Sequence, residues 1–209
     1  MSAPLLWYFA DPMCSWCWGF SPTIEALRET YHERLKIALV LGGLRPGTIT
    51  PMTASARDDI LHHWQQVHER CGQPFKFDGA LPDDFIYDTE PASRAVVTAG
   101  GLDPSTIFAM FKAIQTAFYA GGRNVTQPAV LAELAAGIGI DAAAFLHAFD
   151  SDAARARTQA HFAQSRKAGV RGFPTLILQR GDQLDRITDG WQPLDAVQAE
   201  LDRLLLHTG

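Results

Sequence analysis

The apolar positions in the first 50 residues follow the order strand, helix, strand. Leu5–Phe9 is a short apolar run, and the segment from about Cys14 to His32 has the spacing of a helix. Lys36–Leu41 alternates and is then continuously apolar, which predicts a second strand. Glycine and proline residues between positions 42 and 47 interrupt the pattern. We therefore expect a βαβ unit over residues 1–50.

From about Pro51 to Ala168 the pattern indicates helices alone. Asp103-Pro104 predicts a helix start, and Asp141 and Ser151 predict the caps of two later helices. Apolar residues recur at helical spacing in two stripes, which are Ile60, Trp64, Val67 and Cys71, and then Ile107, Phe111, Ile114 and Phe118. A helical block of this length between two strand-containing segments predicts an insertion over residues 51–168.

The last 41 residues return to strands. Pro174–Arg180 and Leu184–Asp189 flank the short connection 181–183, which predicts a hairpin. Pro193 then opens an amphipathic helix. The fold class is therefore α/β. A small mixed sheet is shared by residues 1–50 and 169–209, and the all-helical insertion divides it in the sequence.

The residues with the clearest chemical meaning are Cys14 and Cys17, which follow the first strand directly. Cysteines three positions apart on a helix are neighbours, close enough to form a disulfide. The unpaired N–H groups and the dipole at a helix N-terminus favour a thiolate on the first of them. Cys14 is therefore the candidate nucleophile, and Cys17 the candidate thiol that resolves a mixed disulfide.

Composition narrows the classes of partner. Apolar residues make up 47% of the 209 residues and charged residues 20%, which is typical of a globular protein. A net charge of −5 disfavours nucleic acids and anionic membranes as partners. No apolar run approaches the roughly 18 residues that a membrane span needs. If the chain is complete, we expect a cytoplasmic protein, because its first residues have no basic region of a secretory leader.

Two segments of this chain resemble the DsbA-like thioredoxin-fold oxidoreductases. They are Tyr8–Phe20, which contains both cysteines, and Gly169–Thr175, with the sequence Gly-Val-Arg-Gly-Phe-Pro-Thr. Within that group the chain is most similar to the cytosolic FrnE-like branch, and the resemblance includes the helical insertion. It implies a thioredoxin-like fold with a large all-helical insertion, with Cys14 attacking, Cys17 resolving and Pro174 as the family's cis-proline.

Residues around that proline are candidates for substrate binding. A cis bond at Pro174 would leave the backbone of Phe173 free to pair with an extended substrate passing over Cys14. Trp16, between the cysteines, is a candidate for shaping the substrate groove and is expected to be partly exposed. Arg171 is a candidate for binding a carboxylate of glutathione or of the substrate. Trp191 and its neighbour Gln192 lie where glutathione-using relatives bind the γ-glutamyl end.

Several residues depart from the family pattern, and the roles of others are not assigned by it. Ser15-Trp16 lacks the histidine of strongly oxidising relatives, which predicts a weaker oxidant than the periplasmic enzymes. Tyr8 stands where many relatives have a buried acid, so the proton acceptor for Cys17 is unassigned. Asp11 is interpreted as a turn residue rather than as that acceptor. Cys71 is interpreted as a buried structural thiol.

Three functions are consistent with these residues. The first is a thiol–disulfide oxidoreductase or isomerase acting on protein thiols or glutathione. The second is a glutathione-dependent transferase or isomerase acting on a small aromatic substrate, as in kappa-class transferases and 2-hydroxychromene-2-carboxylate isomerase. Those relatives, however, have a serine at the position of Cys14 and lack the second cysteine. The third is a non-catalytic zinc module using Cys14, Cys17, His68 and Cys71.

The resemblance also bears on cofactors and assembly. It implies no bound cofactor, because the redox-active disulfide belongs to the chain itself, and it admits glutathione as a co-substrate. Family members often form dimers, so a homodimer is an open alternative to the monomer.

Overall fold

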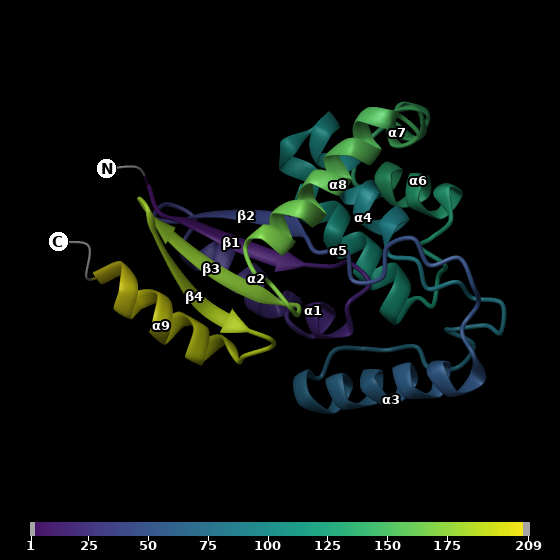
Figure 1. The fold of residues 1–209 in the computed structure, drawn as a ribbon, viewed down its shortest axis with the longest axis horizontal. Helices are drawn as coiled ribbons and strands as arrows, with labels where there is room; N and C mark the ends of the chain where they lie inside the picture. Colours follow the sequence, from purple (N-terminus) through teal and green to yellow (C-terminus); the bar gives the residue numbers. More distant parts are fainter. Residues whose placement is uncertain (1–2, 207–209) are drawn as a thin grey trace.

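A four-stranded mixed sheet forms the centre of the thioredoxin-like part in this computed structural model, which describes residues 3–206 (Figure 1). The strand order is β2-β1-β3-β4, with β1 (Leu5–Ala10) parallel to β2 (Lys36–Leu41). β3 (Thr175–Arg180) runs antiparallel to β1 and to β4 (Gln183–Asp189). All four predicted strands are confirmed to within one residue at each end. The outermost residues of the predicted thioredoxin-like segments, 1–2 and 207–209, lie outside the described residues.

Side chains along the central strands alternate between the two faces of the sheet, and both faces carry buried apolar residues. Leu6, Tyr8 and Ala10 of β1 contribute to the large core, together with Leu176 and Leu178 of β3. The intervening residues form a smaller cluster on the opposite face, which includes Phe9, Val40 and Ile177. Side chains two apart on a strand share a face, so both clusters follow from the sequence pattern.

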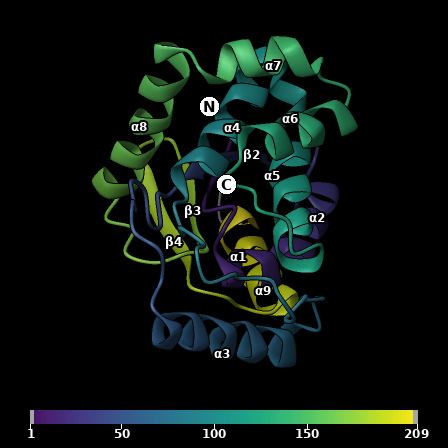
Figure 2. The same ribbon diagram turned by 90° about the vertical axis from the view of Figure 1, so that its right-hand side faces the viewer.

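Helices cover both faces of the sheet. α9 (Leu194–Leu206) packs along β4 and against α2 (Ser21–Thr30), whereas α8 (Asp152–Lys167) packs against β2 (Figures 1 and 2). Between β2 and β3 the chain also forms α4 (Glu90–Leu102), the 3₁₀ turn η1 (Pro104–Thr106), α5 (Ile107–Gln115), the π-helical turn η2 (Thr116–Ala120), α6 (Pro128–Gly137) and α7 (Ala142–Phe149). The predicted caps Asp141 and Ser151 accept hydrogen bonds from Ala144 and Ala154.

α3 (Ala54–Cys71) lies apart from the other inserted helices. In both views it crosses below α1 (Ser15–Gly19), on the opposite side from α4–α8 (Figures 1 and 2). Gly19 of α1 is packed so closely against this helix that an added Cβ would lie 2.9 Å from Val67 and 3.0 Å from the Cys71 sulfur. α3 therefore borders the end of the fold that contains the cysteines.

Two expectations about helices are wrong. The segment from Cys14 to His32 is not one helix, because α1 ends at Gly19 and α2 begins at Ser21. Pro22 has no N–H to continue the hydrogen bonds of α1, and it fits the first turn of a new helix. Residues 72–89 form no helix or strand. Gly72 ends α3 with a φ of 71°, and the aromatic side chains after it pack inward instead.

The division into domains at residues 51 and 168 stays a prediction. One large core contains side chains from the sheet and from the inserted helices alike. Within residues 3–206, none of the helices is both long enough and apolar enough to cross a membrane.

Candidate functional site

Cys14 occupies the N-cap of α1, one residue before its first turn. Its backbone is extended, with φ −94° and ψ 118°, and its carbonyl oxygen accepts a hydrogen bond from the Trp18 N–H at 3.0 Å. Cys14 is 6% exposed and Cys17 is fully buried; neither forms a disulfide. The site is therefore in its dithiol form, with Cys14 outside and Cys17 behind it.

The loop before β3 closes over Cys14. The Phe173–Pro174 bond is cis, as the resemblance implies. The Cys14 thiol donates to the Phe173 carbonyl oxygen, with a sulfur–oxygen distance of 3.6 Å. Gly42 makes this arrangement possible, since a Cβ there would lie 1.9 Å from the Phe173 ring. The backbone that we expect to pair with a substrate is thus already in contact with the candidate nucleophile.

Cys17 lies in a buried polar environment. Burial, followed by the hydrogen bond with Cys14 and the charge of Cys14, raises the pKa of Cys17 well above its usual value. The hydroxyl of Tyr8 has no hydrogen-bond partner in the geometry of residues 3–206, and it lies near the Cys17 thiol. Tyr8 is fully buried, and this burial, with the nearby cysteines, raises the pKa of its phenol as well. Both groups are therefore held in their neutral forms.

Asp11 is the one carboxylate in this environment within the described chain. Its Oδ1 accepts from the Met13 N–H at 2.9 Å and its Oδ2 from the Leu44 N–H at 2.8 Å, which confirms its role in the turn. Asp11 is fully buried, and this burial raises its pKa to about 6 despite those donors. The backbone of Asp11 also lies beside Cys17, where it opposes part of the rise in the pKa of that thiol. A buried acid that titrates near neutrality is thus adjacent to the resolving thiol.

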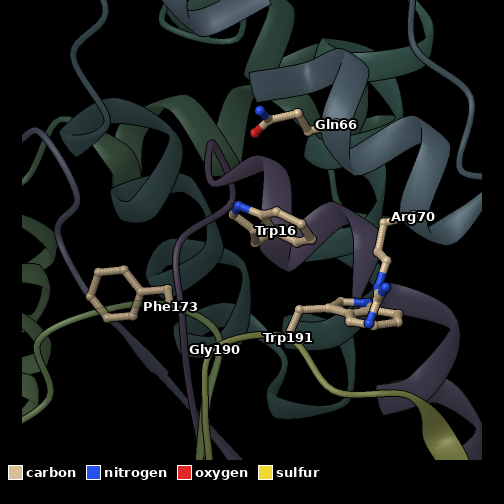
Figure 3. A pocket seen from close by; sticks show the side chains of 6 residues that line it. All are labelled: Trp16, Gln66, Arg70, Phe173, Gly190 and Trp191. Carbon is tan, nitrogen blue, oxygen red and sulfur yellow. The ribbon is translucent and has the colours of Figure 1, made fainter. Parts of the chain in front are cut away.

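Two cavities share the side chains of Trp16 and Phe173 as walls, and Cys14 lines the second of them. We call the first the Arg70 cavity; it has a volume of about 500 Å³ and is lined by Trp16, Gln66, Arg70, Phe173, Gly190 and Trp191 (Figure 3). The second, the Arg45 cavity, has a volume of about 210 Å³ and includes Cys14, Arg45, His63 and Tyr87. The volume of the Arg70 cavity lies within the range typical of small-ligand sites.

Comparison with known proteins decides the family. The model of the DSBA-like thioredoxin domain matches residues 6–202. This chain is a member of the DSBA-like thioredoxin family. A structure from Nitrosomonas europaea, provisionally described as a protein disulfide isomerase, is 46% identical to this DSBA-like chain, with all of both chains covered and a TM-score of 0.94.

A second solved structure bears on the activity. The cytosolic disulfide reductase DsbM from Pseudomonas aeruginosa is 33% identical, with 97% of this DSBA-like chain and 99% of DsbM covered and a TM-score of 0.82. DsbM is also known in a structure with GSH. Among curated proteins, the ClpXP adapter protein SpxH of Halalkalibacterium halodurans is 24% identical over 176 residues. The match covers 82% of this chain but only 57% of the length of SpxH.

The substrate-binding candidates of this DSBA-like chain differ in their placement. Trp16 is half-buried, as expected, and its ring centroid lies 6.4 Å from that of Trp191. Trp191 lines the Arg70 cavity and donates from Nε1 to the Gly19 carbonyl oxygen at 3.1 Å. Arg171 and Gln192 are exposed and line neither cavity. Their assigned roles remain predictions.

The candidates for zinc binding do not come together. No group of three or more potential ligands that could hold a metal ion occurs in residues 3–206, where all four candidates lie. The His68 ring nitrogen Nδ1 hydrogen-bonds to the Gln73 carbonyl oxygen at 2.7 Å. Cys71 is half-buried rather than buried, and its thiol donates to the Val67 carbonyl oxygen at 2.8 Å. The geometry gives the zinc hypothesis no support.

Sequence reasoning missed the arginines of both cavities. Arg70 and Gln66 are one turn apart on α3, beside the buried stripe of that helix. Arg45 follows the glycine pair after β2. Nothing in the sequence shows that α3 crosses α1, so no local pattern could have placed these side chains near Cys14.

Proposed function

We propose that this chain is a cytoplasmic thiol–disulfide oxidoreductase that reduces disulfides, with glutathione or protein thiols as its partners. The observation that supports this most directly is Cys14, nearly buried, in contact with the Phe173 carbonyl oxygen, with Cys17 immediately behind it. The description of DsbM as a cytosolic disulfide reductase supports both the direction and the compartment.

The reaction takes place in two exchanges. The Cys14 thiolate attacks one sulfur of a substrate disulfide, a bond forms between them, and the other substrate sulfur leaves as a thiolate. Cys17 then attacks the Cys14 sulfur of the mixed disulfide, which forms the Cys14–Cys17 disulfide and releases the second substrate thiolate. Two equivalents of a partner thiol such as glutathione reduce this disulfide before the next turnover. Two electrons pass to the substrate, and the protons of Cys14 and Cys17 end on the two released thiols. The reverse sequence oxidises a dithiol.

The environment of Cys17 determines when the second exchange begins. In the dithiol form, two of the causes that raise its pKa are the hydrogen bond with Cys14 and the charge of Cys14. Both are removed when Cys14 is bonded to substrate, so the pKa of Cys17 falls at that point. Cys17 is therefore expected to become reactive only after the mixed disulfide has formed.

Turnover of hydroxyethyl disulfide and of insulin tests the proposal. Cys14→Ser is expected to abolish both activities, and Cys17→Ser is expected to accumulate a mixed disulfide that mass spectrometry detects. Retained turnover in Cys14→Ser would overturn the assignment. A glutathione-dependent reaction that survives Cys17→Ser would favour the transferase alternative instead.

A further inference from the structure

Each of the two cavities that share Trp16 and Phe173 as walls contains an arginine that rests on an aromatic ring. The guanidinium carbon of Arg70 lies 5.2 Å from the centre of the Trp191 ring, and Figure 3 shows the side chain reaching down from α3 onto that ring. In the Arg45 cavity, the guanidinium carbon of Arg45 lies 5.3 Å from the centre of the Tyr87 ring. One positive charge thus lies in the cavity that Cys14 lines, and a second lies in the cavity on the other side of the shared Trp16 and Phe173 walls.

Neither arginine has a carboxylate partner in the described chain. The ion pairs found within residues 3–206 include neither Arg45 nor Arg70. Both side chains are exposed, so their guanidinium groups keep free donors toward the solvent. The attraction between an arginine and an aromatic ring is weak at an exposed site, so the guanidinium can bind an anion as well.

The rings that hold the arginines are themselves fixed to the site. Tyr87 donates its hydroxyl to the carbonyl oxygen of Met13, the residue before Cys14, at 2.6 Å. Trp191 donates to the carbonyl oxygen of Gly19, at the end of α1, at 3.1 Å. The position of each guanidinium relative to the cysteines is therefore restrained. Each rests on a ring that is hydrogen-bonded to the backbone near Cys14 or at the end of α1.

We propose that the two cavities bind a small disulfide or thiol that carries carboxylates on both sides of its sulfur, with Arg70 contacting one carboxylate and Arg45 the other. Glutathione and its disulfide belong to this chemical class. Arginine suits the role because its planar guanidinium can donate two parallel hydrogen bonds to a carboxylate. The substrate sulfur then lies against Cys14, between the walls formed by Trp16 and Phe173. This inference rests on the proposed thiol–disulfide exchange with glutathione and adds the two residues that recognise the carboxylates of that substrate.

The kinetic test compares two disulfides that differ in charge. Glutathione disulfide carries the carboxylates and hydroxyethyl disulfide carries none, so the ratio of their kcat/KM values measures recognition of the carboxylates. We expect Arg70→Gln and Arg45→Gln each to lower this ratio about three- to tenfold, as befits partly exposed charged contacts. Arg70→Lys is expected to restore part of the loss, and added salt is expected to lower the wild-type ratio.

Arg34→Gln is the matched control. Arg34 also rests on an aromatic ring, with its guanidinium carbon 5.1 Å from the centre of the Tyr31 ring, but it lines neither cavity. Its replacement is expected to leave the ratio unchanged. The proposal is overturned if the ratio stays at the wild-type value in both glutamine variants, or if Arg34→Gln lowers it equally.

A binding measurement separates this inference from the proposed function. S-methylglutathione carries both carboxylates but has no thiol to exchange, so calorimetry reports recognition without turnover. We expect it to bind the wild-type protein and to bind Arg70→Gln about three- to tenfold more weakly. Binding without turnover of any disulfide would defeat the proposed function alone. Turnover of both disulfides with no binding, and with equal ratios in all variants, would defeat only the inference.

Discussion

The buried carboxyl of Asp11 makes the stability of this protein depend on pH in a direction opposite to that of most acids. Asp11 is fully buried, and its pKa is about 6 in the folded chain against 3.8 for an unperturbed aspartate. Because the folded state binds the proton more tightly, folding is favoured at low pH, and this contribution is lost as pH rises from 4 to above 6. Asp11→Asn removes the titration while keeping the shape of the side chain.

The magnitude follows from the shift. A difference of about two pKa units corresponds to about 3 kcal/mol between the protonated and ionised forms. Asparagine can still accept one of the hydrogen bonds from Met13 and Leu44, but it leaves the other N–H without its partner, which costs about 1–3 kcal/mol at any pH. The variant is therefore expected to be clearly less stable than wild type near pH 4 and about equally stable near pH 7.5.

Urea unfolding of both reduced proteins, followed by tryptophan fluorescence at several pH values, measures this difference. The contributions of the other titrating groups cancel when the variant is subtracted from wild type. We expect the difference in unfolding free energy to change by about 2–3 kcal/mol between pH 4 and pH 7.5. A difference that stays constant over this range would refute the reasoning. A change of opposite sign would mean that the backbone donors outweigh burial.

Three further outcomes follow from the same site. Gly42→Ala places a Cβ 1.9 Å from the Phe173 ring, so the cis-proline loop must move. The rate of disulfide exchange should then fall at least about tenfold, and circular dichroism serves as the control for folding. Cys14 should react with iodoacetamide at least about tenfold faster than Cys17, because Cys17 is fully buried and has a raised pKa. Equal rates would contradict the assignment of Cys14 as the nucleophile. The Cys71→Ser variant should keep its exchange activity within about twofold of wild type, since the Cys71 thiol hydrogen-bonds to Val67 on its own helix. Loss of activity in a folded variant would show that a third thiol takes part.

The strands and the cysteine pair were predictable because their signals are local. The alternation over Lys36–Leu41 depends only on neighbouring residues, and the spacing of Cys14 and Cys17 is itself the chemical motif. Pro22 favours the break between α1 and α2, and its missing N–H outweighs the helical periodicity on either side of it. Residues 72–89 differ from the expected helices because periodicity cannot distinguish a helix from an extended segment whose aromatic side chains fill a core.

The properties that depend on tertiary packing could not be predicted from the sequence. Asp-Pro correctly predicts a turn, but the burial of Asp11 results from the loop at Leu44 closing over it. The position of Arg70 depends on α3 crossing α1, a contact between helices that are separated in the sequence by β2. The resemblance to the DsbA-like family correctly implied the cis bond at Pro174, which the residues alone left open.

The separation of Cys14 and Phe173 along the chain has a consequence during synthesis. Their contact joins positions 159 residues apart. A ribosome adds about 5–20 residues per second, so Cys14 is made about 10–30 s before the loop that covers it. Until then the nascent chain has both cysteines without their protective cover, open to oxidants and to mispairing. Newly made molecules therefore depend on the reducing capacity of their surroundings until translation has passed β3.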